Sequence, residues 1–180
     1  MSETELCEAQ ATGEPLAGRH CASGAEACLN GAATLSEPVT GESSESWEPL
    51  ILTFCCYWCA YTGADLAGTS RLQYPTNIRI LRVQCSGMVH PNLVIEALTK
   101  GADGVLMLGC HPGDCHYLEG NLRARSRAEA ISLMLEDFGL EPERFRLEWV
   151  SASEGPRFAQ VVTEMVEQVK RLGPSPYRSP

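Results

Sequence analysis

From Leu50 onward, strand-like and helix-like segments alternate along the chain, and this alternation limits the possible folds more than any other feature. Apolar, β-prone runs predict strands at 50–56, 78–85, 104–110 and 145–151. Helical patterns with breaking residues at their ends predict helices at 61–73, 91–100, 118–138 and 158–172. Strands that alternate with helices predict a parallel sheet, because successive crossovers must be right-handed. We therefore predict an α/β fold, a flavodoxin-like three-layer sandwich with a four-stranded parallel sheet in the order 2-1-3-4.

The negative charge of the chain is concentrated before this alternation begins. Residues 1–47 hold eight glutamates and one arginine, Arg19, and so account for −7 of the net charge of −9. The segment shows no sustained period of 2 or 3.6 residues and cannot bury enough apolar surface to offset its ordering entropy. We expect a disordered acidic leader at 1–47, one folded domain at 48–174 and a polar tail at 175–180.

Composition excludes several classes of function. A net charge of −9 argues against nucleic acid as a partner, because phosphate binding needs a basic surface. The apolar runs have the length of strands, and the N-terminus has neither a basic patch nor an apolar signal core. We therefore expect no membrane span and no secretion, and we predict a cytoplasmic protein.

Nine cysteines in such a chain favour metal ligands or redox thiols over structural disulfides. Six of them fall at the carboxyl ends of predicted strands: Cys55, Cys56, Cys59, Cys85, Cys110 and Cys115. In an open α/β sheet the ligand crevice lies beyond these ends, where the strand order reverses, and neighbouring strands are about 5 Å apart. The sequence therefore predicts that thiols from separate loops meet around one small centre.

Not every cysteine is expected to take part. Cys55 points to the opposite side of its strand from Cys56, as a core residue would. In the leader, Cys7, Cys21 and Cys28 lack the short spacings of known zinc motifs, and a second metal site there stays an open alternative.

The kind of centre is open on the residues alone. Structural zinc sites usually pair two short knuckles, and only Cys56-x-x-Cys59 has that spacing. An iron-sulfur cluster tolerates irregular spacing, and loops containing Gly87, Gly109 and Gly113 can bring backbone N–H groups to its sulfurs. The residues thus favour iron-sulfur over zinc, and a structural zinc-binding domain is kept as an alternative.

A different class of function starts from the same cysteines. Cys56 and Cys59 form a C-x-x-C pair between a strand and a helix, as in thioredoxin-like dithiol-disulfide oxidoreductases. That function leaves the other thiols unexplained, and it needs a mixed sheet.

His111 and His116 flank the thiols of the third strand and are candidates for hydrogen bonds to a cofactor. The sequence shows no phosphate-binding glycine motif and no set of catalytic residues beyond the thiols, which indicates an electron carrier that is not itself a catalyst.

Four blocks of the sequence carry a resemblance to a known family: "FCCYWCAYTGADLAG", "YPTNIRILRVQCSG", "GADGVLMLGCHPGDCHYLEGN" and "WVSASEG". From about Trp47 to Gly173 the chain resembles the delta subunit of methyl-viologen-reducing hydrogenase, which is the family of hydrogenase iron-sulfur subunits. The resemblance implies an electron-transfer subunit with one 2Fe-2S cluster. It also implies that electrons pass between a hydrogenase or formate dehydrogenase module and a heterodisulfide reductase of the flavin-bifurcating type.

The same resemblance implies the metal ligands. The cysteine positions of the family correspond to Cys56, Cys59, Cys85, Cys110 and Cys115. Because some relatives lack the second cysteine of the first block, Cys59 is the expected spare, and the other four form the preferred ligand set. After Cys85 the sequence departs from the family pattern, with Met88 and His90 where relatives often have arginine and an acid, and this affects the expectation for partner docking and redox potential.

Overall fold

The computed structural model of the chain describes residues 47–178. The disorder expected of the leader and the cysteines Cys7, Cys21 and Cys28 lie outside the described residues.

Strands and helices alternate through the described part of the chain. The strands are β1 (Ile51–Cys56), β2 (Ile78–Val83), β3 (Gly104–Gly109) and β4 (Phe145–Trp149). The α-helices are α1 (Thr62–Thr69), α2 (Pro91–Thr99), α3 (Gly120–Asp137) and α4 (Gly155–Leu172). Three short helices complete the set: the π-helix η1 (Tyr57–Tyr61) and the 3-10 turns η2 (Ser86–Met88) and η3 (Pro142–Arg144).

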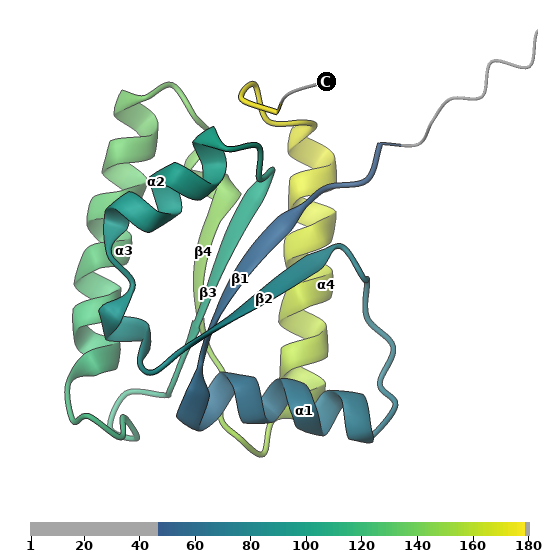
Figure 1. Ribbon diagram of the computed structural model, residues 1–180, viewed down its shortest axis with the longest axis vertical. Coiled ribbons are helices and arrows are strands. Elements are labelled where there is room, and N and C mark those ends of the chain that lie inside the picture. The colour runs from purple at the N-terminus through teal and green to yellow at the C-terminus, as the bar shows by residue number, and fades with distance from the viewer. Residues whose placement is uncertain (1–46, 179–180) are drawn as a thin grey trace, which may run out of the picture. The chain divides into compact units, whose positions relative to one another are not determined.

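The strands form one parallel sheet in the order β2-β1-β3-β4, which confirms the predicted fold class and strand order. Helices α2 and α3 cover one face of the sheet, and α1 and α4 cover the other (Figure 1). In β1, Cys55 pairs with Arg82 of β2 on one side and with Leu108 of β3 on the other. The loops that follow β1, β2 and β3 therefore start side by side at one edge of the sheet.

Strand β3 is buried along its whole length, as its continuous apolar run predicts. Leu106 and Leu108 pack with Phe158 and other residues of α4, while Met107 faces the α2 and α3 side with Leu135. Each such side chain contributes about 1.5–3 kcal/mol of hydrophobic stabilisation. The two cores fix the sheet between the helix layers and so hold the carboxyl ends of its strands in place.

The first crossover helix differs from the predicted span 61–73. It begins at Tyr57 as a π-helix that follows β1 directly, and its α-helical part ends at Thr69. Arg71 has a φ of 55°, and the N–H of Leu72 bonds to the carbonyl of Ala67, which is the Schellman arrangement that ends many helices. The stop signal is thus a backbone conformation at an arginine, where sequence patterns favour glycine.

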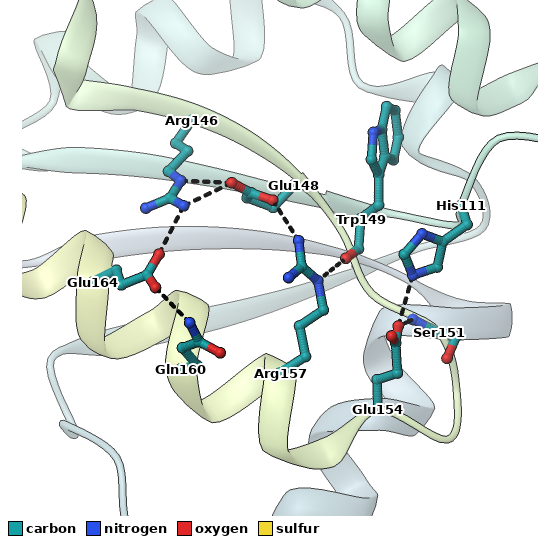
Figure 2. Close-up of polar contacts among 9 residues, drawn as sticks. All are labelled: His111, Arg146, Glu148, Trp149, Ser151, Glu154, Arg157, Gln160 and Glu164. Carbon is teal, nitrogen blue, oxygen red and sulfur yellow. Dashed lines mark hydrogen bonds and ion pairs between the residues drawn. The ribbon is translucent and has the colours of Figure 1, made fainter.

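Strand β4 is joined to α4 by a chain of ion pairs (Figure 2). Arg146 contacts Glu148 at 2.7 Å and Glu164 at 2.8 Å. Arg157 contacts Glu148 at 3.0 Å and donates to the carbonyl of Trp149 at 2.7 Å. Pairs this close to solvent contribute modestly one by one, but together they position Trp149 at the carboxyl end of the strand.

At the amino ends of the strands, buried charges hold the segment that follows α4. The carboxylate of Asp103 accepts from the N–H of Ser175 at 2.9 Å and pairs with Arg178 at 2.6 Å. Arg144 is buried and donates to the carbonyls of Asp103 and Gly173, both at 3.0 Å. This end of the sheet is therefore closed by polar contacts that lie far from the cysteine loops.

None of the helices within residues 47–178 combines the length and the apolar character required to cross a lipid bilayer.

Candidate metal centre

Cysteine side chains gather at the carboxyl ends of β1, β2 and β3, where the strand order brings their loops together. All of them are buried, and none is in a disulfide. We call the following side chains the thiol site: Cys56, Cys59, Cys85, Cys110 and Cys115. They divide by distance into a group of three and a close pair.

The group of three contains Cys56, Cys59 and Cys110, whose Sγ atoms all lie within 4.8 Å of one another. Cys56 and Cys110 are separated by 3.7 Å between Sγ atoms, because β1 and β3 are neighbours in the sheet. The π-helix η1 then brings Cys59 close to Cys56. Such π-helical turns are rare and are frequent at functional sites.

The close pair contains Cys85 and Cys115, with 3.9 Å between their Sγ atoms. Cys85 follows β2, and Cys115 lies in the loop between β3 and α3. Gly120, the first residue of α3, lies against both sulfurs. A Cβ at this position would be 2.2 Å from the Sγ of Cys85 and 3.1 Å from the Sγ of Cys115. Glycine is therefore required here if the pair is to keep its position.

Within the group of three, one cysteine is stabilised as the thiolate and the other two are stabilised as thiols. Hydrogen bonds from Cys110 and Cys59, together with the N–H groups of Trp58 and Ser86, lower the pKa of Cys56 to about 2. The hydrogen bond to Cys56 raises the pKa of Cys110 to about 12. Hydrogen bonds to Cys110 and Cys56, and then burial, raise the pKa of Cys59. Cys56 is thus the first of the three to lose its proton.

Cys115 is a second position where negative charge is stabilised. Burial acts to raise its pKa, but backbone N–H groups of Tyr117, Asn121 and Gly120 outweigh burial, and the pKa of Cys115 is lowered. Two of these N–H groups belong to the first turn of α3, where the helix dipole also favours an anion. Burial, and then the charge of Cys115, raises the pKa of Cys85.

The residues fit a metal group held by thiolates. Soft sulfur donors suit zinc and iron-sulfur clusters, and N–H groups already point at two of the sulfurs. The hydroxyl of Ser86 is buried without a hydrogen-bond partner among the described residues, so one polar group beside the cysteines is left unused by the protein. A pocket of about 390 Å³ opens beside the pair and is lined by Gln84, Cys85, Gly87, Met88, Tyr117, Gly120 and Arg123.

Cys55 is separate from the thiol site, as its place in the strand predicts. It is fully buried in the core on the α1 and α4 side, and burial raises the pKa of its thiol. Its environment is that of an apolar core residue.

His111 is directed at a carboxylate. Its Nε2 lies 2.7 Å from Oε2 of Glu154, which also accepts from the N–H of Ser151 at 2.7 Å (Figure 2). The side chain of Asn121 donates to the carbonyl of His111 at 2.6 Å and to that of Cys110 at 3.1 Å. These contacts fix the loop that carries Cys110 between α3 and the start of α4.

His116 lies on the surface beside the first cysteine loop. Its ring stacks on Trp58 with 3.9 Å between centroids and 17° between planes. The indole N–H of Trp58 donates to the hydroxyl of Tyr117 at 3.3 Å. Both predicted histidines therefore brace cysteine loops, and their contacts to a cofactor stay a prediction.

Sequence reasoning missed Asn121, Gly120 and Ser86. Asn121 gave one signal, since a short polar side chain near the start of a helix often bonds to local backbone. Gly120 and Ser86 gave none, because Gly120 matters chiefly through Cys85, 35 residues away, and Ser86 lies against Gly109, 23 residues away. The sheet is parallel throughout, so it differs from the mixed sheet that a thioredoxin-like fold needs.

Comparison with known proteins gives a consistent family. Residues 51–173 match the family described as methyl-viologen-reducing hydrogenase, delta subunit. The chain is 52% identical over 131 residues to the iron-sulfur subunit of the F420-non-reducing hydrogenase of Archaeoglobus profundus, with 73% of this chain and 96% of that protein covered. It is 49% identical over 131 residues to the iron-sulfur subunit of the F420-non-reducing hydrogenase vhc of Methanococcus voltae, with 73% and 91% covered.

A further relative is built differently. The chain is 46% identical over 126 residues to one subunit of the ferredoxin:CoB-CoM heterodisulfide reductase of Methanosarcina mazei. This alignment covers 70% of the present chain but 16% of the relative. In that protein a similar segment is one part of a much longer polypeptide.

Proposed function

Because this chain belongs to the family of methyl-viologen-reducing hydrogenase delta subunits, we propose that it is an electron-transfer subunit that holds one 2Fe-2S cluster at the thiol site. The observation that carries this proposal is the convergence of buried thiols from three separate loops at one edge of the sheet. Relatives whose names describe them as iron-sulfur subunits support the same chemistry. When bound, such a cluster accepts and returns one electron at a time, typically near −400 mV with thiolate ligands alone.

The proposed ligands are Cys56, Cys85, Cys110 and Cys115. This set consists of two close pairs, since Cys56 and Cys110 are 3.7 Å apart and Cys85 and Cys115 are 3.9 Å apart. Two pairs of thiolates are what a cluster with two irons requires, one pair for each iron. Cys59 is the proposed spare, placed to donate a hydrogen bond within the group of three.

The remaining residues of the thiol site hold and tune the centre. The N–H groups of Trp58 and Ser86 stabilise negative charge on Cys56, and the first turn of α3 does so for Cys115. His111 and His116 are proposed as further residues around the cofactor, through the loops that they brace. Because no other set of reactive side chains was found in the sequence, the chain is proposed to relay electrons without being a catalyst itself.

The proposed partners are the subunits of a hydrogenase or formate dehydrogenase on one side and a heterodisulfide reductase on the other. A segment similar to this chain within a heterodisulfide reductase polypeptide supports the second partner, because fusion keeps two domains permanently close. Free thiols at the proposed site suit a reducing compartment, which supports the proposal of a cytoplasmic location.

Anaerobic purification followed by iron, zinc and acid-labile sulfide analysis tests the function. Two irons and two sulfides per chain, with an EPR signal from the reduced protein, are the expected result for a 2Fe-2S cluster. Zinc without labile sulfide would support the structural-metal alternative. Absence of both, together with an exchangeable disulfide between Cys56 and Cys59, would support a dithiol oxidoreductase. Co-purification of tagged protein with hydrogenase and heterodisulfide reductase subunits tests the partners.

A further inference from the structure

Ser86 lies among the cysteine loops, and its hydroxyl has no partner within the described part of the chain. The residue follows Cys85 directly, and it is 1% exposed. Its Oγ makes no hydrogen bond to any of residues 47–178. A buried hydroxyl without a partner costs free energy, so its position between the loops that carry Cys85 and Cys110 calls for a physical reason.

The backbone of Ser86 belongs to the 3-10 turn η2 that follows Cys85. Its N–H helps to lower the pKa of Cys56, and its carbonyl accepts from the N–H of Val89 at 3.1 Å. Arg127 of α3 donates to the carbonyl of Gly87, and to that of Val89 at 3.2 Å. Arg127 therefore ties the turn that carries Ser86 to α3.

The side chain of Ser86 lies against the end of β3. It lies over Gly109, where a Cβ would be 2.7 Å from the Oγ of Ser86 and 2.9 Å from the ring of Trp149. Gly109 comes directly before Cys110. The hydroxyl is thus buried against the end of β3, one residue before Cys110.

We propose that the hydroxyl of Ser86 donates a hydrogen bond to a sulfur of the metal group bound at the thiol site, and that this bond raises the reduction potential of the group. The inference rests on the proposed function, since it needs a redox-active group in this place. Reduction adds negative charge, which is shared by the sulfurs, so a donor stabilises the reduced state more than the oxidised one. Glycine at position 109 leaves the space that the hydroxyl occupies.

Redox titration of the purified full chain, followed by EPR, compares Ser86→Ala with the unchanged protein. We expect Ser86→Ala to lower the midpoint potential, with about a tenfold smaller ratio of reduced to oxidised protein at a fixed potential, which is about 59 mV for one electron. Ser86→Thr keeps a hydroxyl and is expected to restore most of the shift. Thr53→Val is the matched control, because Thr53 also has a buried hydroxyl without a partner in the described residues. It lies three residues before Cys56, about 10 Å along β1, and its loss should leave the potential unchanged.

Urea unfolding of the metal-free chain separates tuning from a structural role. If the hydroxyl serves only the bound group, metal-free Ser86→Ala is as stable as the unchanged chain or more stable. A loss of stability in the metal-free form, or an unchanged potential in fully loaded Ser86→Ala, would overturn the inference. Failure of the unchanged chain to bind iron and sulfide would instead refute the proposed function.

Discussion

Replacing Gly120 by alanine is expected to remove the metal group while leaving the domain folded. The new Cβ would stand 2.2 Å from the Sγ of Cys85, whereas ordinary contacts need about 3.5 Å. The sulfur of Cys85 must then retreat by roughly 1.3 Å, or the first turn of α3 must move by the same amount. Metal sites tolerate changes of about 0.2 Å in ligand distances, so a displacement of this size takes Cys85 out of the ligand set.

The cost to folding is expected to be smaller than the cost to binding. Overpacking of a buried position lowers the free energy of unfolding by about 1–3 kcal/mol, which most domains withstand. Iron and sulfide content per chain, the visible absorption of the purified protein and urea unfolding of the metal-free form measure the two effects separately. The expected result is a large loss of iron and sulfide with a cooperative unfolding transition retained.

Gly68→Ala is the matched control for this change. Gly68 also lies in a helix, α1, but no atom of the described residues lies within 4 Å of the Cβ that alanine would add. This variant should hold a full complement of iron and be more stable by about 0.5–1 kcal/mol, as alanine usually is in a helix. Full iron and sulfide and an unchanged EPR spectrum in Gly120→Ala would show that the position of the Cys85 sulfur does not matter to the centre.

Three further changes test other parts of the structure. Cys85→Ser should lose the metal group while Cys59→Ser keeps it, measured as iron and sulfide per chain; retention in Cys85→Ser would show that the proposed ligand set is wrong. Arg144→Met should lower the free energy of unfolding by about 2–4 kcal/mol in urea, because the carbonyls of Asp103 and Gly173 lose their buried donor. Hydrogen bonds, chiefly from the N–H of Ser151, lower the pKa of Glu154 to about 2 from an ordinary value near 4.5. The stabilisation that ionised Glu154 gives the folded state is therefore present above pH 4.5 and is lost as the pH falls towards 2. Glu154→Gln should therefore lower the melting temperature of the metal-free protein at pH 6 and have little effect near pH 2, and an equal effect at both would contradict this reasoning.

The sequence was informative where structure follows from repeating patterns. The apolar run at 104–110 predicted a strand buried on both faces, and the alternation of strands and helices predicted the order of the sheet. Because parallel strands end at a common edge, these two points were enough to expect Cys56 and Cys110 near each other, and their sulfurs are 3.7 Å apart. Local pattern and strand order together therefore located the thiol site.

The details of the thiol site depend on contacts between distant segments, and these leave no periodic signal. The π-helical turn that brings Cys59 close to Cys56 was read from the sequence as part of a loop before an ordinary helix. The direction of His111 depends on Glu154, which is 43 residues away. The closeness of Gly120 to Cys85 arises only when α3 has packed against η2. Tertiary packing of this kind overrides what a single segment prefers.

The clustered cysteines come from three separate loops, after β1, β2 and β3. Folding must therefore come before metal loading as this protein is made. No N-terminal fragment that ends before β3 contains both members of either proposed ligand pair, so iron delivered before β3 is made would meet unpaired thiols. The pocket exists only after the third strand has docked and α3 has covered it. If the thiol site holds an iron-sulfur cluster as proposed, loading of the cluster follows folding, and a newly made chain must reach its native shape with these sulfurs still reduced.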